Sequence, residues 1–259
     1  MRVAAVVILV FSMLMAPAAA GAATQVRFVH AVPGASEAVL SVDGDPAGSA
    51  VSYAEAGAYS DAPGGRVRLE VRPSGGGDAV AERSASLGPG RNTVVAWPRG
   101  ERVQLSVYDD GRAEGGTARL RAIHTAGELG RAALRLDGRT LGALIPGQAS
   151  SYKAVEPGAY TLRVTRTGDR GGAPLATRPG VQLVAGTSST AFIVGSGGEP
   201  VRVITAADAS AAPEEGPGTG LGGLEGGVPW LAALLAGLAA GALGGGAYLR
   251  AARGRGRAT

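Results

Sequence analysis

The sequence predicts an all-β protein in which two tandem β-sandwich units are followed by one C-terminal transmembrane helix. Three observations lead to this fold class. Apolar and polar residues alternate with a period of two, the chain repeats itself at an offset near 94 residues, and 22 consecutive residues close to its end carry no charge. The alternation is typical of half-buried strands, the offset of a tandem duplication, and the uncharged run of a membrane span.

The period of two is clearest over residues 66–72, where every second residue is apolar and the others are charged. Turn-forming clusters, such as Asp-Gly-Asp-Pro at 43–46, separate this run from similar ones. Short strands at a spacing of about ten residues predict a small antiparallel, immunoglobulin-like (Ig-like) sandwich in each unit. The 44 glycines, 15 prolines and 4% aromatic residues fit turn-rich β structure better than a helical bundle.

The duplication is visible as an ordered series of matches between two parts of the chain. Residues 26–30 (VRFVH) correspond to residues 120–124 (LRAIH). The later matches pair 39–44 with 133–138, Thr93 with Ser189, and 103–110 with 201–208. These matches predict a first unit over residues 24–112 and a second over residues 113–208, each with its own apolar core.

Residues 1–23 are typical of a secretory signal peptide. A basic residue, Arg2, precedes an apolar run from Val3 to Met15, and small residues follow. Cleavage is predicted either after Ala20 or after Ala23. The alternative is an uncleaved N-terminal anchor.

The uncharged run, residues 228–249, would be about 33 Å long as a helix, which is enough to cross a bilayer. Trp230 and Tyr248 stand near its two ends, where aromatic rings favour the membrane interface, and four arginines follow in residues 250–259. The positive-inside rule therefore predicts an Arg-rich cytoplasmic tail at 250–259 and N-terminal domains outside the cell. A soluble Gly/Ala-rich linker is the alternative, but it would not account for these flanking residues.

Residues 209–227, rich in Gly, Pro and Glu, show no apolar period and predict a flexible linker. Within it, residues 216–220 (GPGTG) resemble the Leu-Pro-x-Thr-Gly signal of wall-sorted proteins, except that glycine replaces the leucine. In the predicted span, Gly237, Gly241 and Gly245 share one helix face, which would allow two copies of the helix to approach closely and self-associate.

Composition excludes several classes of function. The chain has no cysteine, so disulfides, thiolate nucleophiles and Cys-ligated metal sites are excluded. Its net charge of +4 comes from its two ends, because without Arg2 and the four tail arginines 20 basic residues face 21 acidic ones. A nucleic-acid binder needs a basic patch on its folded domain, so no nucleic acid is expected as a partner.

The first unit also carries a family resemblance. Residues 26–35 (VRFVHAVPGA), followed by 42–44 (VDG), 56–59 (AGAY) and 62–65 (APGG), are similar to the bacterial "domain of unknown function 4397" family. The resemblance extends over residues 25–208, although 125–130 depart from the pattern that follows the histidine. Members of that family are typically exported and often anchored, with no established activity. The resemblance therefore implies a location and a fold rather than a mechanism.

His30 and His124 are the only histidines, and they hold equivalent positions in the two units. Neither has a second histidine or a fixed carboxylate close by in sequence, so we expect each ring to bond backbone at a strand end. A role as a ligand or base is the alternative. Asp43, Asp45 and residues 109–111 offer oxygen ligands for calcium, but Asp-Gly and Asp-Pro are also turn residues, and the turn interpretation is preferred.

No catalytic, cofactor-binding or metal-binding residue is therefore predicted, and neither an enzyme activity nor a cofactor is expected. The sequence predicts a non-catalytic, membrane-anchored cell-surface module that presents its two sandwiches at the cell envelope for binding or structural interaction. Its expected partners are the membrane, through residues 228–249, and an unidentified envelope protein or glycan. The alternative is an accessory or catalytic component of envelope polysaccharide modification, which would need a histidine in a cleft within hydrogen-bond reach of a carboxylate or hydroxyl.

Overall fold

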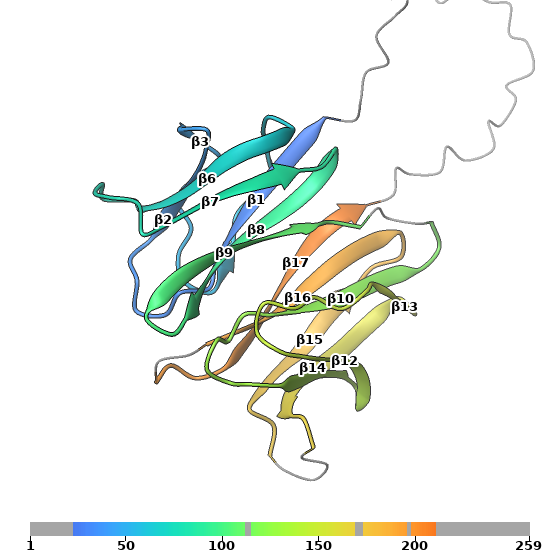
Figure 1. Ribbon diagram of the computed structural model, residues 1–259. Coiled ribbons are helices and arrows are strands. Elements are labelled where there is room, and N and C mark those ends of the chain that lie inside the picture. Colours follow the sequence, from blue (N-terminus) through green and yellow to red (C-terminus); the bar gives the residue numbers. More distant parts are fainter. Residues whose placement is uncertain (1–22, 112–114, 169–172, 196–197, 211–259) are drawn as a thin grey trace, which may run out of the picture. The chain divides into compact units, whose positions relative to one another are not determined.

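A computed structural model describes residues 23–111, 115–168, 173–195 and 198–210 (Figure 1). Within these ranges the chain forms strands and no helix. The strands of the first repeat are β1 (Thr24–His30), β2 (Ala38–Val42), β3 (Asp45–Pro46), β4 (Glu55–Ala56), β5 (Ser60–Asp61), β6 (Gly65–Pro73), β7 (Ala81–Leu87), β8 (Gly90–Arg99) and β9 (Arg102–Asp109). Those of the second repeat are β10 (Ala118–His124), β11 (Ala132–Leu136), β12 (Arg139–Leu144), β13 (Lys153–Val155), β14 (Gly158–Arg166), β15 (Ala176–Leu183), β16 (Thr187–Val194) and β17 (Arg202–Ser210).

Each repeat is a sandwich of two sheets. In the first repeat one sheet has the order β4-β1-β8-β9, with β5 also paired to β1, and the other has the order β3-β2-β6-β7. The second repeat has the corresponding sheets β13-β10-β16-β17 and β12-β11-β14-β15. The described residues therefore confirm the all-β class and the β-sandwich architecture.

The sequence predicted wholly antiparallel sheets, but each repeat contains one parallel pair of strands. β1 runs parallel to β8, with Arg27 opposite Thr93, and β10 runs parallel to β16, with Arg121 opposite Thr190. The reason is topological. The chain leaves β1, builds the other sheet with β2, β3, β6 and β7, and only then returns as β8, so no hairpin forces the two neighbours to be antiparallel.

Each repeat has its own apolar core between its two sheets, and a third apolar cluster is shared by both repeats. Along β1, Val26 and Phe28 face the first repeat's own core, whereas Val29 belongs to the shared cluster. β8 behaves in the same way, with Val94 inward and Val95 in the shared cluster. The sheet that contains β1 and β8 is thus buried on both of its faces, and the two repeats belong to one compact unit.

Two Asp-Gly turns close matching hairpins. Asp43 and Gly44 join β2 to β3 with φ angles of 53° and 96°, and Asp137 and Gly138 join β11 to β12 with 42° and 86°. Positive φ at both central positions is the type I′ geometry that follows the twist of a hairpin, and it explains why Asp-Gly recurs there. The turn interpretation of Asp43 is confirmed, since its Oδ1 also accepts from the Arg68 N–H at 2.7 Å.

Several predictions lie outside the described residues: the signal peptide up to residue 22, most of the linker with the 216–220 motif, the span at 228–249 with its glycine face, and the tail at 250–259. In the described part of the chain, no helix is long and apolar enough to cross a membrane. One boundary differs from expectation. β17 continues to Ser210, paired with Thr187, so regular structure reaches two residues into the predicted linker.

Candidate functional site

His30 is held by two backbone groups at the end of β1. The Val32 N–H donates to His30 Nδ1 at 3.2 Å, and His30 Nε2 lies 2.9 Å from the Ser36 carbonyl oxygen. Because Nδ1 accepts a hydrogen bond, the proton of the neutral ring sits on Nε2 and is donated to that carbonyl. Both ring nitrogens are therefore occupied by the turn that follows the strand.

His124 repeats this arrangement at the end of β10. Its Nδ1 accepts from the Ala126 N–H at 3.2 Å, and its Nε2 lies 2.8 Å from the Gly130 carbonyl oxygen. Burial lowers the pKa of His30 and of His124 below the ordinary value, and the carbonyl bond opposes this effect only in part. The expectation that each ring bonds nearby backbone is confirmed.

A buried carboxylate, that of Asp110, lies where the two repeats meet. Within its own repeat it accepts from Thr93 Oγ1 at 2.7 Å and from the Tyr59 hydroxyl at 2.5 Å. From the other repeat Arg121 donates to it through Nη2, as an ion pair. The Asp110 side chain is 0% exposed and that of Arg121 only 5%, so water does not compete for these bonds.

Asp208 is the equivalent carboxylate of the second repeat and is held in the same way. It accepts from Thr190 Oγ1 at 2.6 Å and from the Tyr152 hydroxyl at 2.7 Å. Its ion-pair partner is Arg27 of the first repeat. Burial raises the pKa of Asp208, and the Arg27 guanidinium and the Thr190 hydroxyl act against that rise.

Arg27 and Arg121 therefore each pair with a carboxylate of the other repeat. Arg27 donates through Nε to Thr93 of its own repeat at 2.8 Å and reaches Asp208 of the other. Arg121 donates through Nε to Thr190 at 2.8 Å and reaches Asp110. The exchange is reciprocal, as at an interface between two copies related by a two-fold axis. We call the set Arg27, Tyr59, Thr93, Asp110, Arg121, Tyr152, Thr190 and Asp208 the joint network.

The tyrosines of the joint network also stack against its arginines. The Arg27 guanidinium carbon lies 4.9 Å from the centre of the Tyr59 ring, and that of Arg121 lies 4.7 Å from the centre of the Tyr152 ring. Burial raises the pKa of both tyrosines, so they remain protonated donors. Each tyrosine thus holds a carboxylate with its hydroxyl and an arginine with its ring.

Apolar side chains seal the joint network from solvent. The shared cluster contains Trp97 and Phe192 together with Val29, Val95 and Ile123, all at most 3% exposed. Trp97 also donates from Nε1 to Ser106 Oγ at 2.9 Å, so its polar edge is satisfied. Aromatic burial of this kind contributes strongly to an interface, and it removes the water that would weaken the ion pairs.

Two sequence interpretations need correction here. Asp110 was expected to be a turn residue, but its carboxylate instead receives the buried donors of both repeats. The match of Thr93 with Ser189 is wrong by one position: strand pairing places Thr93 opposite Arg27 and Thr190 opposite Arg121. Thr93 and Thr190 are therefore the equivalent residues, and the error arose from a gap in the alignment between the two repeats.

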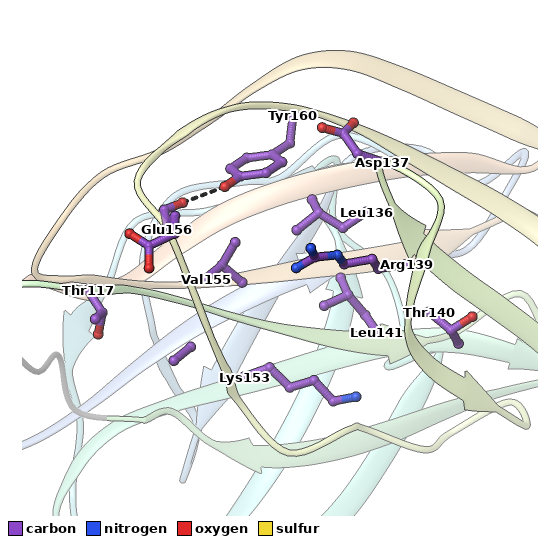
Figure 2. A pocket seen from close by; sticks show the side chains of 11 residues that line it. Thr117, Leu136, Asp137, Arg139, Thr140, Leu141, Lys153, Val155, Glu156 and Tyr160 are labelled. Carbon is purple, nitrogen blue, oxygen red and sulfur yellow. Dashed lines mark hydrogen bonds between the residues drawn. The ribbon is translucent and has the colours of Figure 1, made fainter.

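A cleft opens at one edge of the second sandwich, between β12 of one sheet and β13 of the other (Figure 2). Its volume is about 650 Å³. Leu136, Leu141, Val155 and Tyr160 supply apolar lining and also pack on the core of the repeat. The polar lining consists of Thr117, Asp137, Arg139, Thr140, Lys153 and Glu156, and the Tyr160 hydroxyl donates to the Glu156 carbonyl at 2.7 Å.

Across the ranges that the structure describes, no three His, Asp or Glu side chains gather closely enough to hold a metal ion. The histidines do not lie in the cleft of the second repeat, nor do the carboxylates of the joint network. The two histidines, the carboxylates of the joint network and the charged residues of the cleft thus lie in separate places.

Residues 24–131 match the pattern of the family described as "Domain of unknown function (DUF4397)". This segment belongs to that family. The DUF4397 segment contains the whole first sandwich and continues through β10, so it includes Asp110 and its partner Arg121 from the joint network. A search of curated proteins found no match to the chain.

The joint network was not among the sites predicted from the sequence, although one sequence pattern indicated it. Residues 94–97 and 191–194 are unbroken apolar runs without the alternation of a half-buried strand. Such runs are typical of strands that are covered on both faces. They predict that the outer face of each of these sheets packs against another part of the protein. Such packing also explains why Arg27 and Arg121 lie in otherwise apolar strands.

Proposed function

We propose that this protein is a non-catalytic, membrane-tethered surface module that presents its two sandwiches at the cell envelope as one rigid body. The predicted leader at 1–23, the predicted span at 228–249 and the arginine tail support the location. The joint network supports the rigid body. Its carboxylates and arginines are sealed, and each makes bonds across the boundary between the repeats.

The positions of the histidines and of the buried carboxylates support a binding or structural role rather than catalysis. A general acid or base must reach the proton that it transfers. Both histidines use their two ring nitrogens on backbone groups, and Asp110 and Asp208 have side chains that are 0% exposed. In the described part of the chain, these are the groups that a hydrolytic or transfer reaction would recruit first, and their bonds stabilise the fold instead.

The test has a topological arm and a binding arm. A reporter fused after Thr259 should be active in the cytoplasm, while protease added to intact protoplasts should remove the two sandwiches. The purified full chain should bind isolated cell envelopes and leave their polysaccharide chemically unchanged. A C-terminus outside the cell contradicts the tether, and a change in the acetylation or length of the polysaccharide would favour the role in polysaccharide modification.

A further inference from the structure

A small apolar pocket opens in the first repeat, beside the ring of His30 at the end of β1. Its volume is about 90 Å³. Aliphatic side chains form most of its lining: Val32, Val71, Val80, Val103, Ala35 and Ala96. Val80 is 51% exposed, so the pocket has an apolar rim in contact with water.

The pocket offers almost no polar surface to an occupant. Both ring nitrogens of His30 are already used, because Nδ1 accepts from the Val32 N–H and Nε2 bonds the Ser36 carbonyl oxygen. A ligand group with hydroxyls or charge would lose its bonds to water on entering and would not regain them. The pocket therefore selects an apolar group and disfavours a saccharide.

The second repeat has a larger side chain at a corresponding position. In each repeat, histidine Nε2 bonds the carbonyl six residues further on, that of Ser36 or that of Gly130. The residue just before this carbonyl is Ala35 in the first repeat and Leu129 in the second. Leu129 packs on the apolar core of its own repeat, whereas Ala35 is exposed and lines the pocket.

Two further positions differ in the same sense. The residue paired with the histidine is Ala96 in the first repeat and Ile193 in the second. Val80 corresponds to Leu175, because each donates its N–H at 2.8 Å to a valine carbonyl on the neighbouring strand. Leu175 packs on the core of its repeat, while Val80 is about half exposed. The second repeat thus fills with its own side chains a space that the first repeat leaves open.

The volume of the pocket also limits what can enter it. Small-molecule sites usually have volumes of about 300–1,000 Å³, and an apolar cavity of about 150 Å³ can hold benzene. At about 90 Å³ the pocket of the first repeat is smaller than either. A branched aliphatic group suits it, and the second repeat shows that a leucine side chain is the natural filling at this place in the fold.

We infer that this pocket binds a leucine side chain presented by a partner protein. The inference rests on the proposed function, since it names a protein rather than a glycan as the partner of the surface module. A single apolar side chain recovers little beyond the entropy that association costs, so the pocket acts as one anchor point within a larger contact. The lining valines and alanines supply the apolar surface that this anchor buries.

The first test uses the full chain in a lipid nanodisc and follows the valine methyl signals by NMR. The probes are pentapeptides Gly-Gly-X-Gly-Gly, in which X is leucine, alanine or phenylalanine, and octanoate as a linear acyl chain. The leucine peptide should shift the signals of Val71, Val80 and Val103 and bind at least about tenfold more tightly than the alanine peptide, because it buries three more carbon atoms. Equal affinity for these two peptides, or tighter binding of the phenylalanine peptide or of octanoate, would overturn the inference.

Variants fill or open the pocket itself. Ala35→Leu installs the residue of the second repeat, so it should abolish binding of the leucine peptide and raise the melting temperature by about 2–4 °C. The matched control is Ala50→Leu, an exposed position of the same repeat outside the lining, which should do neither. Val80→Ser changes only a half-exposed side chain and should weaken binding several-fold, so it tests the pocket even where Ala35→Leu strains the fold. Unchanged binding in both pocket variants contradicts the inference.

The last arm separates a partner protein from other occupants. Binding of the full chain to isolated envelopes should fall at least about tenfold with Ala35→Leu, and also after the envelopes are treated with protease. Binding that survives both changes would overturn the inference and leave the surface module and its topology intact. Light scattering should give the same mass for the wild type and for Ala35→Leu. Self-association of the wild type alone would mean that a second copy fills the pocket, which also contradicts a separate partner.

Discussion

Arg27 forms a buried ion pair with Asp208, a residue 181 positions further along the chain and at the last strand of the other repeat. The equivalent pair, Arg121 with Asp110, spans only 11 positions, yet it has the same chemistry. The first pair joins β1 to β17, the first and last strands in the described part of the chain. The second ties the two repeats at their junction.

Removing one carboxylate of this exchange should destabilise both repeats. Asp208→Asn leaves Arg27 buried without a counter-charge, which costs about 3–5 kcal/mol in the free energy of unfolding. Asp110→Asn should have a similar effect through Arg121. Urea denaturation of both variants measures it.

The control for that experiment is Glu199→Gln. Glu199 lies 3.9 Å from Arg202, and both side chains are about half exposed, at 45% and 53%. An exposed pair of this kind contributes about 0–1 kcal/mol. Losses of less than about 1 kcal/mol in both aspartate variants would show that the joint network is not a source of stability.

The reciprocal exchange predicts that the first repeat alone forms a homodimer. An isolated fragment of residues 24–111 exposes Val29, Val95 and Trp97 and leaves Arg27 without its partner. A second copy offers an equivalent apolar face and its own Asp110, so the two-fold arrangement of the chain can be rebuilt between two copies. Light scattering after size exclusion should report twice the fragment mass.

The same fragment with Asp110→Asn should shift toward monomer, since that change removes both cross-copy ion pairs at once. Full-length protein carries both repeats and should not gain a second copy at this face. A folded, monomeric wild-type fragment would contradict the prediction.

The alternation of polar and apolar residues was sufficient to predict the strands and the sandwich of each repeat. The duplicated Asp-Gly turns could be predicted as well, because the turn geometry depends on the Asp-Gly pair itself. The histidine bonds could be predicted because they reach at most six residues away. The joint network could not. Alternation shows that a strand has two faces, but it does not show which distant strand covers the second face, and Arg27 meets Asp208 only through that packing. The parallel pairing of β1 and β8 escaped prediction for a similar reason, since it depends on the order in which the two sheets are built.

Replacing a histidine by alanine should affect stability before it affects binding. His30→Ala removes one donor and one acceptor, each of which serves a backbone group, so a loss of about 0.5–1.5 kcal/mol is expected for a hydrogen bond and about 1–3 kcal/mol if the Val32 N–H is left unpaired. His124→Ala should behave alike. Thermal unfolding and binding to isolated envelopes are measured side by side at a temperature where both variants are folded. Unchanged stability with complete loss of binding or of an envelope activity would revive a functional role for the rings.

The histidines also predict how stability depends on pH. Burial lowers the pKa of both rings in the folded protein, so the unfolded chain binds more protons than the folded one between the lowered values and the unfolded value of about 6.5. Their contribution is therefore fully present above about pH 6.5 and is lost as the pH falls through this window. The structure supplies the reason, because a protonated ring has no acceptor at Nδ1 for the Val32 or Ala126 N–H. Asp208 acts in the opposite direction, since burial raises the pKa of that carboxyl. The histidine contribution to the unfolding free energy must therefore be measured as a difference between two proteins.

The wild-type protein and the His30→Gln/His124→Gln double variant should be unfolded in urea at pH 7.5, 6.5 and 5.5. The gap in unfolding free energy between them should narrow as the pH falls, because only the wild type loses the histidine contribution. A gap that stays constant over this range would mean that the rings do not titrate differently in the folded and unfolded states, and a gap that widens toward low pH would mean that they are charged in the fold.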